Sequence, residues 1–120
     1  MSDLLTSKAG TITSGEDRFM AWKTIDGNYE NTDAAGFDTF FIGMFMKDRI
    51  LDIIKNFICF NNDGKNTFKI LAGYHQYFAV KKAIESTKKA AKIDGNGKGG
   101  VFWHTQGSGK SLSMVFTGFC

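Results

Sequence analysis

A glycine-rich segment near the C-terminal end of the chain has the residue types of a phosphate-binding loop. It reads His104-Thr105-Gln106-Gly107-Ser108-Gly109-Lys110-Ser111. Gly107 and Gly109 would let backbone N–H groups close around phosphate oxygens without side chains in the way. Lys110 would reach the β- and γ-phosphates of a nucleotide, and the Ser111 hydroxyl would bind its Mg²⁺. We therefore predict that ATP and Mg²⁺ bind at Thr105, Gln106, Gly107, Ser108, Gly109, Lys110 and Ser111.

The first position of this glycine-rich loop (residues 104–111) departs from the standard pattern. The pattern G-x-x-x-x-G-K-[ST] expects glycine where this chain has His104. Helicase-type loops relax that position and keep the later Gly-x-Gly-Lys-Ser/Thr, so the departure favours a motor ATPase. A structural interpretation stays open, because glycine-rich turns that begin a helix are common.

A glutamine upstream of the loop offers a second nucleotide contact. Gln76 lies in Tyr74-His75-Gln76-Tyr77-Phe78, at the expected start of a helix. An adenine edge needs one donor and one acceptor together, and a carboxamide supplies both. Gln76 is therefore a candidate adenine-reading residue. The competing interpretation is a helix start with packed aromatic rings.

Periodicity and turn residues predict the elements that position these groups. Apolar residues recur at spacings of three and four over residues 38–59 and again over 74–91. The first stretch predicts one or two helices and the second predicts one. The Asp-Gly pair within 61–66 predicts a tight turn. The run Gly100–His104 predicts a short strand and 111–116 a helix, so we expect a mainly α-helical chain with one strand leading into the loop.

Length and composition indicate a globular protein. The chain has 120 residues, of which 42% are hydrophobic, 14% aromatic and 22% charged, which fits one ordinary domain and excludes a disordered chain. It has no apolar run of about eighteen residues and no secretory signal after Met1, so we expect a cytoplasmic protein outside the membrane. Cys59 and Cys120 lack the spacing of a zinc site, and Cys59 is expected to be a small buried side chain.

The charge is distributed unevenly along the chain. Residues 1–60 contain six basic and nine acidic residues, a net charge of −3, whereas residues 61–120 contain nine and three, a net charge of +6. A lysine-rich second half suits a polyanion such as a nucleotide or a nucleic acid. A solvated lysine face remains the alternative interpretation.

Two blocks of the sequence, residues 71–80 and 99–116, form a specific pattern. They read Leu-Ala-Gly-Tyr-His-Gln-Tyr-Phe-Ala-Val and Gly-Gly-Val-Phe-Trp-His-Thr-Gln-Gly-Ser-Gly-Lys-Ser-Leu-Ser-Met-Val-Phe. Together they resemble the motor-entry region of the restriction (R) subunit of type I restriction-modification enzymes. Residues 43–45 and 49–57 resemble the part of that subunit where its nuclease domain passes into the motor. The resemblance covers nearly the whole chain.

The resemblance implies an ATP-driven double-stranded DNA translocase of helicase superfamily 2, joined to an endonuclease domain and assembled with modification and specificity subunits. It implies an α/β parent protein with a P-loop RecA-like fold. Residues 1–60 would be the end of the nuclease domain with its connecting helices, and 61–120 the start of the first motor domain. Lys110 and Ser111 match the phosphate and magnesium residues, and Gln76 matches the adenine-reading glutamine. No catalytic residue of the nuclease transfers to this chain.

The resemblance also implies missing parts. No acidic residue follows Lys110, so a second magnesium motif is absent and we expect a fragment that is catalytically inert by itself. A single strand of a parallel sheet lacks its neighbours, so we expect weak packing, aggregation and exposed apolar side chains. These side chains are Val101, Phe102, Trp103, Val115, Phe116 and Phe119.

Two other functions stay open. One is a small nucleotide-binding module that does not hydrolyse its ligand, and the other is a basic helical adaptor that binds nucleic acid through phosphates. The substitution Lys110→Ala distinguishes them, because it would abolish binding by the first and change binding by the second only slightly. The sequence assigns no role to Arg18, Trp22 or Lys23.

Overall fold

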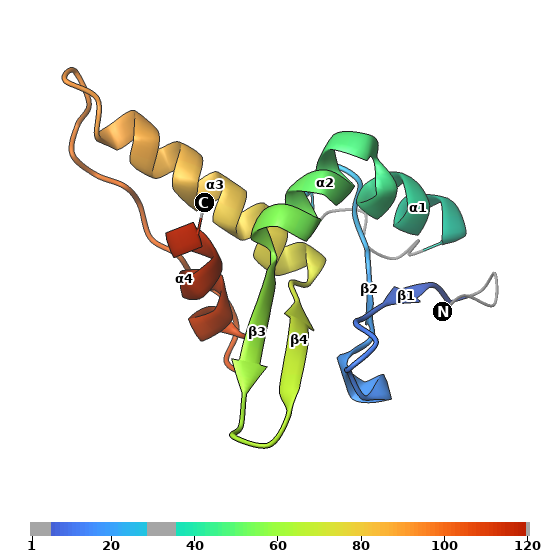
Figure 1. The fold of residues 1–120 in the computed structure, drawn as a ribbon. Coiled ribbons are helices and arrows are strands. Elements are labelled where there is room, and N and C mark those ends of the chain that lie inside the picture. The colour runs from blue at the N-terminus through green and yellow to red at the C-terminus, as the bar shows by residue number, and fades with distance from the viewer. Residues whose placement is uncertain (1–5, 29–35, 120) are drawn as a thin grey trace. The chain divides into compact units, whose positions relative to one another are not determined.

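The computed structural model of the chain describes residues 6–28 and 36–119 (Figure 1). The chain divides into two compact units, Met1–Tyr74 and His75–Cys120. The assignment of residues 1–60 and 61–120 to two parent domains stays a prediction. None of the described helices combines the length and the apolar character that a membrane crossing requires.

The N-terminal segment of the first unit forms a small sheet. Strand β1 (Lys8–Ala9) pairs antiparallel with β2 (Met20–Ala21), and the 3₁₀ helix η1 (Glu16–Arg18) lies between them. Directly after β2, Trp22 is only 3% exposed. A Cβ atom placed on Gly43 would lie 2.5 Å from the Trp22 ring, so this close approach requires glycine. Trp22 is therefore a core residue, whereas the two basic residues without an assigned role, Arg18 and Lys23, are exposed.

The first apolar repeat forms two helices. Helix α1 (Phe37–Phe45) buries Phe40 and Met44, which lie four residues apart on one face. Met46, with φ −51° and ψ 132°, interrupts the helix, and α2 (Lys47–Asn56) follows. The prediction of one or two helices in this stretch is confirmed.

The predicted helical stretch ends earlier than expected, because a β-hairpin follows. Strands β3 (Ile58–Asn62) and β4 (Thr67–Leu71) pair antiparallel over five residues each. The helical prediction is therefore wrong for Ile58 and Cys59, since their partners come from beyond the turn and local periodicity does not register them. Cys59 is half-buried, and burial raises the pKa of its thiol. Cys120 lies outside the described residues.

The Asp-Gly sequence forms the predicted tight turn between these strands. The Asp63 carboxylate accepts hydrogen bonds from the backbone N–H groups of Asn66, at 2.8 Å, and Lys65, at 2.9 Å. These two groups hold the pKa of Asp63 below its usual range. Gly64 has a φ of +89°, which favours glycine.

The outer edge of β4 is covered by threonine side chains. Thr11 Oγ1 donates a hydrogen bond of 2.8 Å to the Lys69 carbonyl, and the Lys69 N–H donates one of 2.8 Å to Thr13 Oγ1. Both groups of Lys69 that face away from β3 are thereby satisfied by hydroxyl groups. The hairpin consequently needs no third strand at this position.

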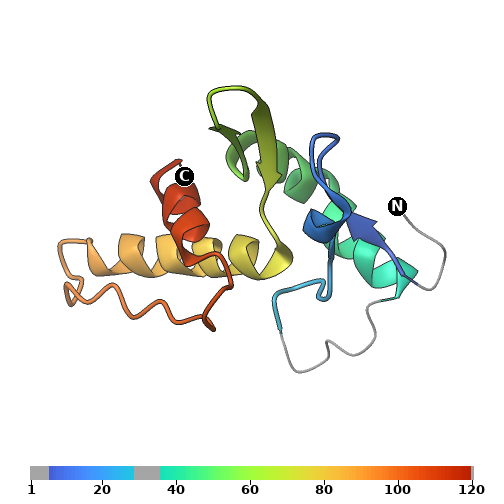
Figure 2. The same ribbon diagram turned by 90° about the horizontal axis from the view of Figure 1, so that it is seen from below.

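The second unit contains two helices and a long connection. Helix α3 (Tyr74–Ala90) and helix α4 (Lys110–Phe119) confirm the helices predicted over 74–91 and 111–116. Both ribbon views show the connection running back along α3 (Figures 1 and 2). The buried residues of α3 are Gln76, Tyr77, Phe78 and Val80.

The strand predicted before the glycine-rich loop does not form. Residues 101–104 pair with no strand among the described residues. Val101 is 94% exposed and Trp103 79% exposed. A strand is stabilised by hydrogen bonds to neighbouring strands, so an apolar and β-branched sequence does not produce one where the described chain supplies no neighbour.

The expected exposure of the C-terminal apolar residues is correct for some side chains and wrong for one. Phe102 and Val115 are exposed, at 38% and 43%. Phe116 is instead fully buried. Phe116 shares a face of α4 with the buried Ser113, three residues before it, so helix formation places both side chains on the same side and tertiary packing covers them. The side chain of Phe119 lies outside the described set.

Candidate nucleotide-binding site

The glycine-rich loop leads directly into α4. Gly107 has a φ of +81° and Gly109 one of +75°, a backbone conformation that favours glycine at both positions. The first α-helical hydrogen bond runs from the Ser113 N–H to the Gly109 carbonyl, at 3.1 Å. The N–H groups of the first turn of a ten-residue helix therefore follow the loop, where the helix dipole favours an anion.

Lys110 is held across the loop that precedes it. Its Nζ donates hydrogen bonds of 3.0 Å to the carbonyl oxygens of His104 and Thr105. The Thr105 carbonyl also accepts a hydrogen bond of 3.3 Å from the Ser108 N–H. Lys110 is nevertheless exposed, so its ammonium group can exchange these carbonyl oxygens for the oxygens of an entering anion.

Gln76 and His75, in the first turn of α3, fasten the loop to that helix. Gln76 Nε2 donates a hydrogen bond of 3.1 Å to the Gly109 carbonyl and a longer one, of 3.5 Å, to the Ser108 carbonyl. The Ser108 carbonyl also accepts a hydrogen bond from His75 Nε2, at 3.2 Å. Since Gln76 is only 4% exposed, its amide sets the position of the loop in this structure.

His104 contributes a partly buried imidazole at the start of the loop. Its ring centroid lies 5.7 Å from that of His75 and 4.9 Å from that of Phe102. Burial, then the nearby His75 and Lys110, hold the pKa of His104 below its usual range. The ring is therefore neutral at neutral pH.

Two polar atoms beside the loop are buried and have no hydrogen-bond partner among the described residues. They are Nδ1 of His104 and Oγ of Ser108. A buried polar atom without a partner costs stability, and such atoms are frequent at binding sites. The remaining predicted site residues, which are exposed, are Thr105, Gln106, Gly107 and Ser111.

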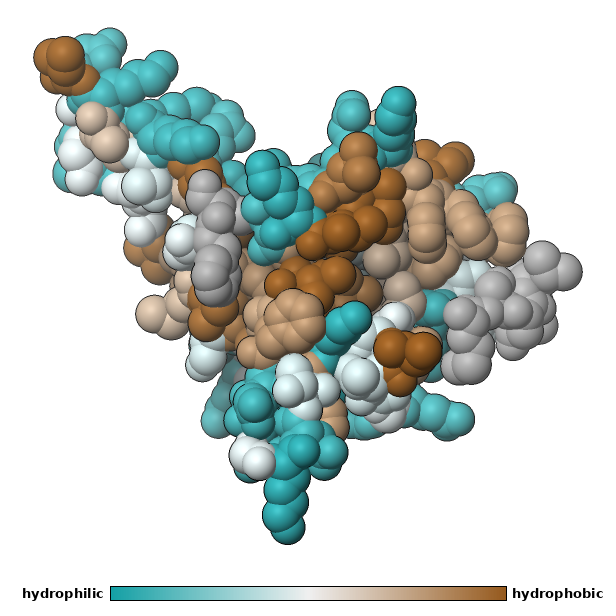
Figure 3. Space-filling model, viewed as in Figure 1, coloured by the Kyte–Doolittle hydropathy of each residue, from teal (hydrophilic) through white to brown (hydrophobic). Residues whose placement is uncertain are grey.

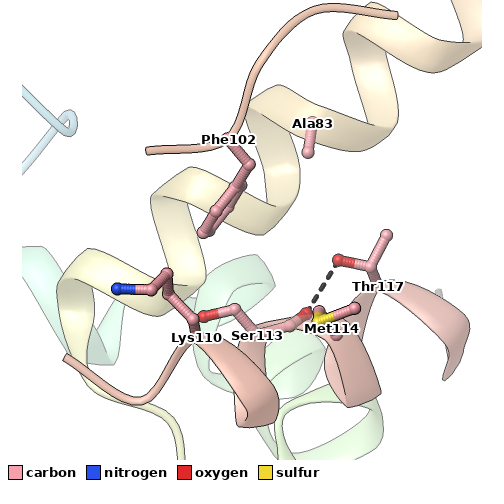
Figure 4. A pocket seen from close by; sticks show the side chains of 6 residues that line it. All are labelled: Ala83, Phe102, Lys110, Ser113, Met114 and Thr117. Atoms are coloured by element: carbon pink, nitrogen blue, oxygen red, sulfur yellow. Dashed lines mark hydrogen bonds between the residues drawn. The ribbon is translucent and has the colours of Figure 1, made fainter. Parts of the chain in front are cut away.

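An apolar hollow lies next to the loop within the second unit. It has a volume of about 500 Å³ and is lined by Ala83, Phe102, Lys110, Ser113, Met114 and Thr117 (Figure 4). Phe102 reaches into it from the connection, and the Thr117 hydroxyl is occupied by a hydrogen bond of 2.8 Å to the Ser113 carbonyl. Lys110 supplies the one charge of this lining, so the groups suited to phosphate belong to the loop.

The residues present fit a nucleoside triphosphate with its metal. A Cβ atom on Gly107 would meet nothing within 4 Å, so the loop backbone is open to an approaching phosphate. Ser108 Oγ and His104 Nδ1 are the partnerless polar atoms beside it. Ser111, directly after Lys110, is the residue that would hold Mg²⁺. The described residues contain no cluster of three or more His, Cys, Asp or Glu side chains.

The sequence pattern indicated Gln76 and the loop as site residues but did not indicate contacts for His75 and His104. His75 directly precedes Gln76, and His104 occupies the position where glycine is standard. The unusual first position of the motif was a signal for His104. No local pattern indicated that His75 would bind the Ser108 carbonyl, because the two residues are 33 positions apart.

A comparison with known protein families matches the part of the chain that begins in the first turn of α3. Residues 75–119 match the SWI2/SNF2 ATPase family. This match contains Gln76 and the whole glycine-rich loop. No solved structure matches the chain.

Curated relatives match the chain along nearly all its length. The chain is 37% identical to the type I restriction enzyme HindI endonuclease subunit of Haemophilus influenzae, over 97% of this chain and 11% of that protein. It is 32% identical to the putative type I restriction enzyme MjaIXP endonuclease subunit of Methanocaldococcus jannaschii, over 97% of this chain and 13% of that protein. The chain thus spans little more than a tenth of the length of these relatives.

Proposed function

Because this chain belongs to the family of type I restriction enzyme endonuclease subunits, we propose that residues 75–119 form the ATP-binding entry of a DNA-translocating motor. The loop geometry is the observation that supports this most directly. Two glycines with positive φ precede a helix that begins with Lys110, whose ammonium group already lies over the loop. This arrangement provides backbone donors, a helix N-terminus and an exposed cation for phosphate.

ATP binding replaces the contacts that Lys110 makes in this structure. The ammonium group leaves the carbonyl oxygens of His104 and Thr105 for the β- and γ-phosphates. The Ser111 hydroxyl would hold Mg²⁺ together with the nucleotide, and the ion would neutralise phosphate charge. The sequence has no acidic residue after Lys110, so we propose that this chain binds ATP without turning it over.

The parent protein follows from the family. We propose an α/β motor with a RecA-like P-loop fold of helicase superfamily 2, with residues 1–60 as the connection from a nuclease domain and 61–120 as the start of the motor. Its partners would be double-stranded DNA and the modification and specificity subunits of the same restriction complex. The SWI2/SNF2 ATPase match over 75–119 supports the assignment to a nucleotide-driven motor.

A calorimetric titration of the chain with Mg²⁺-ATP tests the proposed site. Lys110→Ala removes a charge-assisted phosphate contact and should weaken binding about tenfold or more. Lys98→Ala, at an exposed lysine before the loop, is the matched control and should leave binding unchanged. Equal affinities for the two variants would show that the loop does not bind ATP.

The role of Gln76 requires a separate comparison, because its amide is bound to the loop in this structure. If Gln76 reads adenine, Gln76→Ala should weaken ATP binding and leave GTP binding unchanged. If it only positions the loop, the same substitution should weaken both nucleotides equally. We propose the adenine-reading role, so an unchanged ratio of ATP to GTP affinity contradicts it.

A further inference from the structure

The second half of α3 and the connection after it are strongly basic. Residues 81–98 contain six lysines and two acidic residues, a net charge of +4, and all eight of these residues are exposed. Figure 3 shows mostly hydrophilic (teal) surface over the C-terminal end of α3 and the start of the connection. The basic residues are Lys81, Lys82, Lys88, Lys89, Lys92 and Lys98.

Helix geometry gathers these charges on one side. At about 100° per residue, the lysines of α3 fall within an arc of roughly 120°. From Lys81 to Lys89 the helix rises about 12 Å, and Lys92 follows two residues after the helix ends at Ala90. The group of Lys81, Lys82, Lys88, Lys89 and Lys92 is called the lysine face below.

The connection folds back against the helix beside this face. Ser86 Oγ donates a hydrogen bond of 2.6 Å to the Gly99 carbonyl, and the Gly97 N–H donates one of 3.3 Å to the Ala90 carbonyl. These bonds hold the connection close to the end of α3. Lys98 lies between the two glycines that make these bonds, so its backbone is held close to α3.

Two of these lysines, Lys88 and Lys89, also interact favourably with the helix itself. Lys88 and Lys89 lie in the last turn, where the helix dipole favours cations, and Lys89 pairs with Glu85 at 2.7 Å. Lys89 also holds the pKa of Glu85 below its usual range, through a hydrogen bond and its charge. Lys92 belongs to neither group, since it follows the end of α3 at Ala90.

The composition of the lysine face selects among polyanions. Residues 81–98 include no aromatic residue, so the face offers no platform on which the bases of a single strand could stack. Duplex DNA instead presents about one negative charge per 1.7 Å of its axis, and lysines bind such a backbone without reading bases. Over the rise from Lys81 to Lys89 a duplex presents about seven phosphate charges.

We propose that the lysine face binds the phosphate backbone of double-stranded DNA, at a surface distinct from the glycine-rich loop. The choice of DNA over other polyanions rests on the proposed function, whereas the location rests on the charge and geometry of α3. Because the contact is to phosphates, it carries no sequence preference. The nucleotide site and the DNA surface thus share helix α3, one near its start and one near its end.

Fluorescence anisotropy with a short labelled duplex, measured at several salt concentrations, tests this surface. The variant Lys81→Gln/Lys88→Gln/Lys92→Gln should lower the salt slope by about 2.7, from three lost phosphate contacts. Between about 50 and 200 mM salt the original chain should then lose roughly 40-fold more affinity than the variant. A control variant, Lys47→Gln/Lys55→Gln/Lys65→Gln, removes the same charge from exposed positions in the first unit and should keep the original slope.

Equal slopes in the two triple variants would overturn the proposal, since binding would then follow total charge. Competition by polyglutamate as effective as that of unlabelled duplex would also overturn it, in favour of an acidic protein partner. The variant Lys81→Arg/Lys88→Arg/Lys92→Arg preserves charge and should bind DNA like the original chain, which excludes misfolding as the cause of a loss. Titration of the glutamine variant with Mg²⁺-ATP should give unchanged affinity, so failure at the DNA surface is distinguishable from failure of the nucleotide site.

Discussion

The two glycines of the loop provide a matched pair for testing how the loop is fastened to α3. Both have positive φ, +81° at Gly107 and +75° at Gly109. A Cβ atom on Gly107 would meet nothing within 4 Å, whereas one on Gly109 would lie 2.5 Å from Nε2 of Gln76. Alanine at either position must adopt the unfavourable left-handed backbone conformation, but alanine at Gly109 also displaces the Gln76 amide.

The expected costs follow from these contacts. The backbone conformation costs alanine about 1–2 kcal/mol at each position. Gln76 Nε2 donates to the Gly109 carbonyl at 3.1 Å, and breaking the bond of a buried amide costs about 1–3 kcal/mol more. Gly109→Ala should therefore lower the free energy of unfolding by about 1–3 kcal/mol more than Gly107→Ala does.

Urea unfolding followed by far-ultraviolet circular dichroism measures both variants, and a double-mutant cycle isolates the contact. Adding Gln76→Ala removes the obstructing amide, so Gly109→Ala should then cost only its backbone conformation. The Gln76–Gly109 cycle should give a coupling of about 1 kcal/mol or more, and the Gln76–Gly107 cycle a coupling near zero. Equal losses of unfolding free energy for the two glycine variants, or equal coupling energies in the two cycles, would contradict a stabilising contact between Gln76 and Gly109.

Three further outcomes are expected. Burial holds the pKa of His104 below its ordinary value of 6.5, so the unfolded chain takes up this proton first as the pH falls. The contribution of neutral His104 to the free energy of unfolding should be complete above pH 6.5 and should decline as the pH falls from 6.5 to the lowered pKa. The urea midpoint of His104→Gln should lack this part of the pH dependence. Phe116→Ala should lower the free energy of unfolding by about 3–5 kcal/mol, because Phe116 is fully buried. Met114→Ala, at a side chain 75% exposed, should change the free energy of unfolding by less than about 1 kcal/mol. Similar urea midpoints for the two variants would contradict the burial of Phe116. Thr11→Val removes the bond to the Lys69 carbonyl and opens the edge of β4, so it should cost about 1 kcal/mol and increase light scattering, and a variant that scatters no more than the original chain argues against edge protection.

Elements with a strong local signal were predictable. Helices α3 and α4 and the Asp-Gly turn at Asp63 follow from residue spacing and turn chemistry within a few positions. Lys110 and Ser111 are predicted as phosphate and magnesium residues by a motif whose chemistry depends on adjacent residues, and these roles stay predictions. In each case the interacting groups are neighbours in the chain, so one short window contains the information.

Elements that depend on a partner strand were not predictable in the same way. Ile58 and Cys59 continue an apolar helical repeat, yet they pair with β4 across the turn. Val101–His104 has the composition of a strand, yet no described strand lies beside it. Strand formation requires hydrogen bonds to another segment, so the same composition gives a strand in one place and none in the other.

The sequence by itself determined the glycine-rich loop before a helix, the candidate phosphate-binding residues within it, and the uneven distribution of lysines. Only the tertiary structure decided that the buried amide of Gln76 holds the Gly109 carbonyl, that His75 binds the Ser108 carbonyl, and that Phe116 is covered. The physical reason is the separation along the sequence between the groups that interact. Backbone conformation and charge depend on nearby residues, whereas burial and the choice of hydrogen-bond partner depend on segments that folding brings together from more than thirty residues away.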